Sequence, residues 1–373
     1  MKKLSNLNGN FEYELLDENQ QVADLREKLA LLYESPFSDI LWWELRDNSL
    51  VSDGYYKLFY YEQSVLKHII LFKYSAKSEK KISVINNWFK IFVKDIQNIC
   101  YILFNEFDKL QIIFFERLFT NPEKMPKMIF DEGRLGAKTM WLGNDIIIPL
   151  PESMDAYLKS LSKNTREIIS KKRNRIVRVF PDFKVNNFEK SDISFELIEE
   201  LFALKQKKMI VCGIVPAYSA NESRYLYEYF SNSGLGFLSI CTIDNKMVSG
   251  MTITVFGEHA YAHIIAHDLS FEKYSAGEIA LFNAIKYLIE VKKVKYCHML
   301  DGRQRYKYQH GGIDHNSYYV HVFRNKGINY YIVKIKTTVR KIRNYVDNYF
   351  YQRLRNNKII YNLYRKLKKT IRK

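Results

Sequence analysis

The second half of the chain alternates most clearly between helical and extended patterns. Apolar residues recur every three to four positions over residues 194–209 and 276–291, which predicts two amphipathic helices. Short apolar runs separated by the turn-forming pairs Asp244-Asn245 and Gly257-Glu258 predict an antiparallel meander between these helices. The predicted order is a helix, three strands, a helix and two strands, over residues 194–209, 236–242, 247–256, 259–267, 276–291, 295–300 and 318–323.

The first half has a less regular α/β pattern. It predicts a short helix, the two strands of a hairpin, one or two helices and two further strands, over residues 24–34, 55–61, 66–73, 82–104, 110–115 and 146–150. A basic helix is predicted over residues 154–179, where lysine and arginine stand between apolar residues at helical spacing. The chain as a whole predicts a mixed α/β (α+β) fold with mostly antiparallel sheets flanked by helices.

The length of 373 residues and the apolar content of 47% suffice for two globular units. We expect units over residues 1–150 and 151–329 and a basic tail over residues 330–373. No apolar run reaches the roughly 18 to 20 residues of a membrane span. Met1-Lys2-Lys3 is not followed by the hydrophobic segment of a signal peptide, so we expect a soluble, cytoplasmic protein.

Four cysteines lie far apart in apolar surroundings, at positions 100, 212, 241 and 297. They form no CxxC pair and have no ligand-like spacing to histidine, so we expect buried, reduced thiols and no metal.

The net charge of +17 suggests an anionic partner, and much of the excess lies in the tail. From residue 330 onward the chain has 14 Lys and Arg against the single acid Asp347. Three interpretations stay open for this segment: a solvated tail, an amphipathic helix on anionic membrane lipid, and a nucleic-acid contact such as tRNA.

The strand predicted over residues 259–267 has a period-2 pattern. A strict alternation places one set of residues toward a helix and the other on a face that is either simply exposed or lines a substrate site. The first set is Ala260, Ala262, Ile264 and Ala266, and the second is His259, Tyr261, His263, Ile265 and His267. A zinc site is the least favoured interpretation, because strand neighbours on one face lie roughly 7 Å apart while zinc ligands converge at about 2 Å.

A loop from Asp268 to Tyr274 leads into Ser275-Ala276-Gly277, which opens the next predicted helix. Free backbone N–H groups and the helix dipole make this turn a candidate anion site, with Gly277 allowing close approach and Lys273 adding charge. The alternative is a capping box, in which Ser275 and Glu278 satisfy those N–H groups themselves.

The segment from Leu300 to Gly312 mixes titratable residues with glycines after a predicted strand, a common place for functional groups. Here the sequence resembles the FemAB/CelD-like branch of the GNAT acyltransferase superfamily. The residues that carry the resemblance are Asp301-Gly302-Arg303, Tyr306-Lys307, Gly311-Gly312, the turn Ser275-Ala276-Gly277, Asp268 and the stretch Leu161 to Arg166. They span roughly residues 149–323, and the resemblance implies that residues 1–150 are a degenerate second copy, so that two GNAT-like domains stand in tandem.

The resemblance further implies an N-acyltransferase that uses acetyl-CoA or another acyl-CoA, without a metal. The acceptor is expected to be an amine of a sugar or of a small-molecule or lipid-linked precursor of the cell envelope or its polysaccharides. The diphosphate of the donor is expected at Ser275, Ala276 and Gly277, with backbone N–H groups from Ile265 to His267 receiving the thioester oxygen.

The same resemblance suggests roles for the side chains around the donor. His267, Asp268 and Asp301 are the candidate proton acceptors, which we leave unranked. Tyr306 is expected to protonate the departing thiolate, and Arg303 or Lys307 to hold a carboxylate or phosphate. An ordinary ion-pair network in the loop is the alternative for these residues.

Two other functions remain open. One is a Fem-type transferase that takes an aminoacyl group from charged tRNA for a peptidoglycan bridge, although residues 183–236 leave no room for a long helical arm. The other is a non-catalytic basic protein that binds lipid or RNA. Peripheral contact of the tail with the inner face of the cell membrane would suit an enzyme that acts on lipid-linked precursors.

Overall fold

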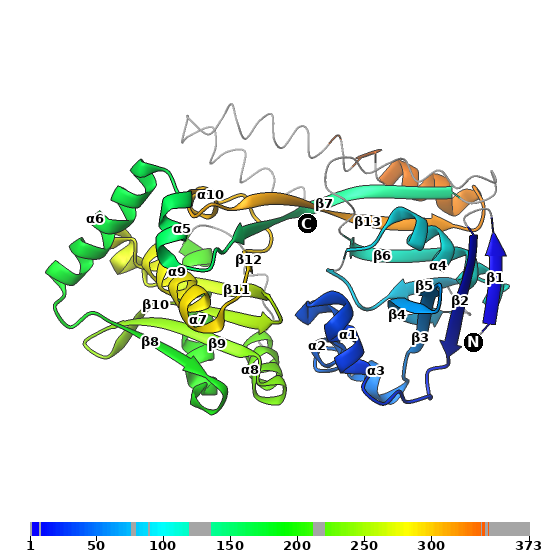
Figure 1. The fold of residues 1–373 in the computed structure, drawn as a ribbon, viewed down its shortest axis with the longest axis horizontal. Helices are drawn as coiled ribbons and strands as arrows, with labels where there is room; N and C mark the ends of the chain where they lie inside the picture. The colour runs from blue at the N-terminus through cyan, green and yellow to red at the C-terminus, as the bar shows by residue number, and fades with distance from the viewer. Residues whose placement is uncertain are drawn as a thin grey trace.

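The computed structural model describes residues 2–6, 9–75, 80–88, 90–118, 136–211, 221–336, 338–339 and 342. These residues form two lobes that lie side by side and are joined by two long strands, β7 and β13 (Figure 1). Within them, all strands belong to one thirteen-stranded sheet of order β1-β2-β3-β4-β5-β6-β13-β7-β12-β11-β10-β9-β8.

The N-terminal lobe packs α4 against one face of its strands and α1 against the other. Ile96, Ile99 and Leu103 of α4 are buried in one hydrophobic cluster, and Leu25 and Leu29 of α1 in another. The elements of this lobe are β1 (Lys2–Asn6), β2 (Gly9–Leu16), α1 (Leu25–Tyr33), η1 (Pro36–Ser38), α2 (Ile40–Glu44), α3 (Asn48–Ser52), β3 (Tyr56–Glu62), β4 (Val65–Ser75), β5 (Lys81–Val84), α4 (Val93–Glu106) and β6 (Ile112–Leu118).

The C-terminal lobe has α9 on one face of its sheet and α7 on the other. Leu281 and Ile285 of α9 pack with Ala260, whereas Ile198 and Leu201 of α7 belong to the opposite cluster. The remaining elements are β7 (Gly136–Pro149), α5 (Met154–Ser160), α6 (Lys163–Val179), β8 (Lys184–Glu189), η2 (Lys190–Asp192), α7 (Phe195–Val211), α8 (Glu222–Ser233), β9 (Gly236–Ile243), β10 (Lys246–Phe256), β11 (His259–His267), η3 (Leu269–Tyr274), α9 (Ala276–Tyr287), the π-helical turn η4 (Leu288–Lys292), β12 (Tyr296–His298), α10 (Arg305–Gln309) and β13 (Ile313–Phe323).

Both lobes repeat one motif, in which a strand is followed by a helix and a parallel strand. The motif is β5-α4-β6 in the first lobe and β11-α9-β12 in the second. The strand that follows each motif crosses to the other lobe, because β7 pairs with β12 and β13 pairs with β6. This repeat confirms the predicted mixed fold with tandem GNAT-like units.

The exchanged strands contribute to the core of the lobe they enter. Ile146 and Ile148 of β7 are buried among residues of the second lobe, and Val320 and Val322 of β13 among residues of the first. A third cluster joins the lobes directly, since Phe37, Trp42 and Trp88 pack with residues of α7 and β11. The division near residue 150 remains a prediction, but neither lobe completes its core without a strand from the other half.

Three predicted elements were wrong in their limits. Residues 82–84 belong to the strand β5 and the helix α4 begins only at Val93, because a short apolar run fits a buried strand as well as a helix. The basic helix over residues 154–179 is broken into α5 and α6, and the Ser162 side chain caps α6 by accepting a hydrogen bond from the Thr165 backbone N–H. The strand predicted over residues 295–300 ends at His298.

Cys100, Cys241 and Cys297 are free and buried, which confirms the prediction for these three, whereas Cys212 lies outside the described residues. Most of the basic tail also lies outside them, and of this segment residues 328–336 are helical. In the described part of the chain, no helix is both long and apolar enough to cross a membrane.

Candidate active site

A β-bulge at His263 corrects the predicted alternation along β11. Thr252 of β10 pairs with Ile264 and the next residue, Ile253, pairs with Ala262, so His263 is an extra residue. The bulge reverses which residues face each helix: Ala262 and Ile265 lie on the α9 side, and Ile264 with Ala266 on the α7 side. The expectation that Ala260, Ala262, Ile264 and Ala266 share one face was therefore wrong.

The second half of β11 has an unpaired backbone edge. β12 pairs with β11 only through His259 to Tyr261. Further along, the Asp268 N–H donates to the Val248 carbonyl of β10 at 2.8 Å. Because successive N–H groups of a strand point to opposite edges, those of Ile265 and His267 point away from β10. The predicted position for an acyl oxygen is thus a strand edge with free donors.

The start of α9 is not closed by a capping box. Ser275 adopts a left-handed conformation, with φ of 59°, and its side chain makes no capping hydrogen bond. Glu278 instead forms an ion pair with Lys172 of α6 at 2.6 Å. No acceptor is recorded within the described chain for the N–H groups of Ala276 and Gly277. The alternative in which side chains seal this helix end is therefore wrong.

His267 lies directly over this helix start. A Cβ atom added to Gly277 would lie 2.7 Å from His267 Nδ1, so only glycine fits beneath the imidazole. His267 Nε2 is 3.1 Å from the Lys208 ammonium of α7. Burial lowers the pKa of His267, and the charge of Lys208 lowers the pKa further, so this histidine is neutral at pH 7 with its Nε2 lone pair engaged by Lys208.

Cations from two further elements surround the start of α9. Arg175 of α6 donates to the Lys273 carbonyl at 3.3 Å, and the Lys273 ammonium lies over the Tyr274 ring. Lys273 is exposed, as its predicted role next to a diphosphate requires.

Asp268 is poorly suited to be the general base. Its carboxylate accepts hydrogen bonds from the Ser270 backbone and hydroxyl groups and caps η3. These bonds to Ser270 lower the pKa of Asp268, so the carboxylate takes up a proton only in acid.

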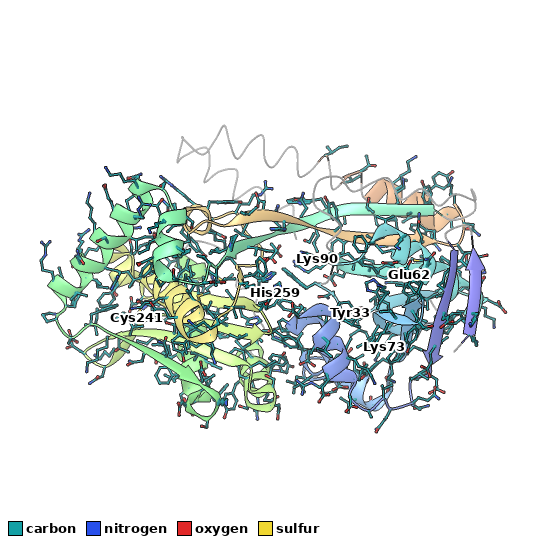
Figure 2. All side chains as sticks on the ribbon, viewed as in Figure 1. Tyr33, Glu62, Lys73, Lys90, Cys241 and His259 are labelled. Carbon is teal, nitrogen blue, oxygen red and sulfur yellow. The ribbon has the colours of Figure 1, made fainter. Side chains whose placement is uncertain are left out.

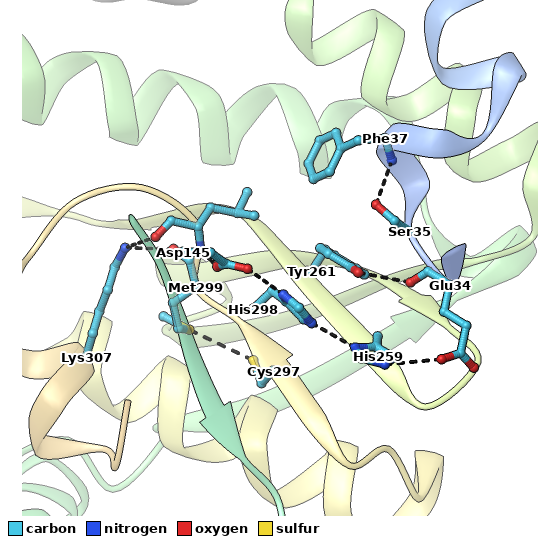
Figure 3. A network of polar contacts seen from close by, with 11 residues as sticks. Glu34, Ser35, Phe37, Asp145, His259, Tyr261, Cys297, His298, Met299 and Lys307 are labelled. Atoms are coloured by element: carbon cyan, nitrogen blue, oxygen red, sulfur yellow. Dashed lines mark hydrogen bonds and ion pairs between the residues drawn. The ribbon is translucent and has the colours of Figure 1, made fainter. Parts of the chain in front are cut away.

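The predicted role of Lys307 as a ligand for phosphate or carboxylate was wrong. Its ammonium donates to the carbonyls of Met299, Leu300 and Asp301 at 2.7, 3.1 and 2.7 Å, which uses all three of its protons. The side chain is buried, with 3% exposed, and burial lowers the pKa of Lys307 to about 8. Lys307 therefore shapes the loop that carries Asp301 (Figure 3).

Asp301 lies where the two lobes meet. Its Oδ2 is 2.6 Å from the guanidinium of Arg117, which itself lies over the Trp88 ring. Arg117 and Asp301 have equivalent places in the repeat. Arg117 lies three residues after Phe114, the last residue of β6 that pairs with β5, and Asp301 lies three residues after His298, the last residue of β12 that pairs with β11.

Non-glycine residues with positive φ gather around this ion pair. Trp88, Arg117 and Leu300 have φ of 58°, 51° and 53°. The Trp88 N–H donates to the Arg117 carbonyl, and the Leu300 N–H to the Asp145 carboxylate, both at 3.0 Å. Strained backbone of this kind persists where surrounding contacts impose it and is concentrated at functional sites.

The other two predicted residues of the loop are placed differently. Tyr306 is half-buried beside the cluster under α9, and burial raises its pKa to about 12, so its hydroxyl keeps its proton at neutral pH. Arg303 is exposed, with its guanidinium 3.6 Å from Asp314 and near the Trp141 ring. No contact in the described residues joins Arg303 to the start of α9.

A polar network that the sequence did not predict runs from the buried Asp145 to Glu34 of the other lobe (Figure 3). Asp145 is 2.5 Å from His298, His298 is 2.8 Å from His259, and His259 is 3.2 Å from Glu34. Burial lowers the pKa of His259 to about 4, with a further contribution from His298. Figure 2 shows His259 and Lys90 on the facing sides of the two lobes.

Residues 163–308 match a family model described as an acetyltransferase (GNAT) domain. The chain contains a GNAT domain. It therefore contains an acyltransferase domain, and the resemblance seen in the 300–312 segment is confirmed at the level of the family. The matched segment includes every predicted site residue.

Solved structures extend the likeness over both lobes of this GNAT protein. FemX has a TM-score of 0.56 at 10% identity, covering 82% of this chain and 96% of its own. L-PGS from Bacillus licheniformis has a TM-score of 0.51 at 13% identity, with 87% and 97% covered. The C-terminal domain of a putative lysylphosphatidylglycerol synthetase from Agrobacterium fabrum has a TM-score of 0.51 at 11% identity, with 84% and 95% covered.

At these identities the likeness shows a shared FemX-like fold. No curated protein matches the chain in sequence. Among the described residues, no group of three or more His, Cys, Asp or Glu side chains could hold a metal ion.

Proposed function

We propose that this GNAT protein transfers an acyl group from an acyl-CoA, with acetyl-CoA as the first candidate, to an amine of a sugar or cell-envelope precursor. The observation that carries the proposal is the open start of α9 beside the unpaired edge of β11, within the segment that matches the acetyltransferase family model. The free N–H groups at the start of α9 suit the diphosphate of a carrier, and the edge of β11 suits the acyl group on the same carrier.

In this mechanism the donor diphosphate binds at Ala276 and Gly277, and the acyl oxygen accepts hydrogen bonds from the edge N–H groups of Ile265 and His267. The amine attacks the acyl carbon and its proton passes to a base. Asp301 is our candidate, because its carboxylate is 45% exposed and its loop continues from the end of β12. Arg117 holds its Oδ2, which leaves Oδ1 to take the proton, and Lys208 engages the alternative His267. Tyr306 then donates its proton to the departing thiolate.

A transfer from charged tRNA is the second candidate. The likeness to FemX and to lysylphosphatidylglycerol synthetases favours it, and so does the surface of α6 next to the start of α9. This helix exposes five cations, which suit a polyanion: Lys163, Lys171, Arg173, Arg175 and Arg178.

Calorimetry and transfer assays with the two donors side by side separate these functions. We expect saturable binding of acetyl-CoA, competition by inorganic pyrophosphate, and acetyl transfer to a panel of amino sugars. Transfer from charged tRNA, with no binding of acetyl-CoA, would replace the first candidate by the second. A protein that binds neither donor but binds RNA or lipid tightly would defeat both and favour the non-catalytic alternative.

We also propose that the C-terminal segment brings the enzyme to an anionic membrane surface, near lipid-linked acceptors. The described part of this segment supports the idea, since Ile328, Tyr331 and Ile335 are exposed at helical spacing, with Lys334 and Lys336 beside them. Sedimentation with vesicles of phosphatidylglycerol and phosphatidylcholine tests it. Equal partition of the full chain and a folded chain that ends at Gly327 would refute it.

A further inference from the structure

Lys205 of α7 lies at the unpaired edge of β11, where the proposed acyl oxygen binds. α7 packs across the face of β11, and the Lys205 ammonium donates to the Ile265 carbonyl at 3.2 Å. The N–H and C=O groups of one strand residue point to the same edge, so this ammonium lies on the side to which the Ile265 N–H also points. Nothing in the sequence pattern of α7 distinguishes Lys205 from its neighbours.

The charge of Lys205 has no acidic partner in the described part of the chain. The Ile265 carbonyl is its one recorded hydrogen-bond acceptor, which leaves two ammonium protons uncommitted. Two cationic groups interact with its charge, Lys208 on the same helix and Lys307 of α10. Burial lowers the pKa of Lys205, and the charge of Lys208 lowers it further.

A half-buried cation without a counter-charge destabilises the free protein, because desolvation is not offset by an ion pair. The same position stabilises any negative charge that forms within reach. Near this edge, three carbonyls engage the Lys307 ammonium and His267 engages that of Lys208. Lys205 is the ammonium that reaches the backbone of Ile265, and within the described residues it retains two protons for a ligand.

We propose that Lys205 is a catalytic residue that stabilises the negative oxygen formed on the acyl carbonyl during transfer. This inference rests on the proposed acyltransferase function. The amine nitrogen forms a bond to the acyl carbon while the π electrons of the C=O bond move to oxygen. One free Lys205 proton and the Ile265 N–H then donate to that oxyanion.

The electron pair returns to the carbonyl when the bond from carbon to the carrier breaks. The carrier leaves with the bonding electrons and receives the proton lost by the amine nitrogen, so amide and protonated carrier are the products. The negative charge on the acyl oxygen exists only during the transfer. Lys205 is therefore expected to stabilise the transition state more than the bound donor.

Lys205→Met tests the role, because methionine keeps the apolar stem and removes the charge. Lys207→Met is the matched control, since Lys207 is exposed on the same helix. The site residue that its charge reaches is Asp268, which the proposed mechanism does not use as the base. We expect Lys205→Met to lower kcat about 100-fold, with the KM for the donor changed less than threefold. Lys207→Met should match the wild type, and equal melting temperatures would show that both variants are folded.

Lys205→Arg supplies the second readout. Arginine keeps its charge at all accessible pH values, so any decline of wild-type kcat in mild base that comes from loss of the Lys205 proton should disappear in this variant. Lys205→Arg leaves the other titratable groups near this edge in place, namely His267, Asp268, Asp301, Lys208 and Lys307.

The outcomes separate two failures. Equal kcat for Lys205→Met and the wild type, or a loss confined to KM, would overturn the role of Lys205 and leave the transferase intact. No transfer by the wild type from acetyl-CoA or charged tRNA would defeat the proposed function, and this inference with it.

Discussion

Replacing Lys307 with methionine tests whether this buried ammonium holds the loop that carries Asp301. The substitution keeps the apolar stem but removes donors from the carbonyls of Met299, Leu300 and Asp301. Each buried carbonyl left without its donor costs about 1–3 kcal/mol, so at the lower end the loss of three donors costs roughly 3 kcal/mol. We expect a fall of this size in the free energy of unfolding at pH 7, measured by urea denaturation.

The dependence of stability on pH provides an independent signature of Lys307. Its pKa is lowered from 10.5 to about 8 in the folded protein. Between these values the folded state has lost the proton that the unfolded state still binds, so stability rises with pH across this window. At about 1.4 kcal/mol per pKa unit, the rise amounts to roughly 3 kcal/mol. Below pH 8 both states are protonated and Lys307 contributes no slope.

Lys307→Met should lose this rise, whereas Lys286→Met on the exposed side of α9 should keep the wild-type curve. Turnover of Lys307→Met should also fall at least tenfold, because the position of Asp301 depends on the loop. A variant as stable as the wild type, with an unchanged slope between pH 8 and 10.5, would refute the reasoning.

Three further predictions follow from the same site. Asp301→Ala should lower turnover at least tenfold, about 1.4 kcal/mol of barrier, and a wild-type rate would remove this carboxylate from the reaction. Gly277→Val should raise the KM for the donor at least tenfold, because its Cβ would lie 2.7 Å from His267 Nδ1, and unchanged donor binding in calorimetry would contradict a diphosphate at this turn. Asp145→Asn should lower the free energy of unfolding by about 2–4 kcal/mol, because it removes a fully buried charge from its hydrogen bonds to His298 and the Leu300 backbone, and equal denaturation curves would count against the network.

Local patterns in the sequence were sufficient for much of the fold of the second lobe. The helix over residues 276–291 and the meander before it were predicted from their periodicity, and the structure has α9, β9, β10 and β11 there. The same reasoning failed at His263, because a bulge inserts one residue and reverses every later side chain of β11. It also failed at residues 82–84, where a short apolar run did not distinguish a strand from a helix.

The site was also predicted only in part, because local patterns do not show which distant residues a side chain contacts. The sequence located the turn at Ser275 to Gly277 and the loop at Asp301, since glycines and titratable residues stand out after a strand. It assigned a ligand role to Lys307 from residue type alone, although three carbonyls occupy the ammonium in the structure. No local pattern indicated a role for Arg117, because its partner Asp301 is 184 positions away. None indicated a role for Lys205 either, because it lies within an ordinary amphipathic helix.

The sequence by itself determined the class of fold, the positions of α7, α9 and the meander of β9 to β11, and the resemblance to the GNAT family. Tertiary structure alone decided that β7 and β13 exchange lobes, that Asp145 reaches Glu34 through two histidines, and that Lys205 lies at the edge of β11. Helical and extended periodicities depend on residues a few positions apart, so they can be read along the chain. The partner of a buried polar side chain depends on which distant segments pack together, and no local pattern contains that information.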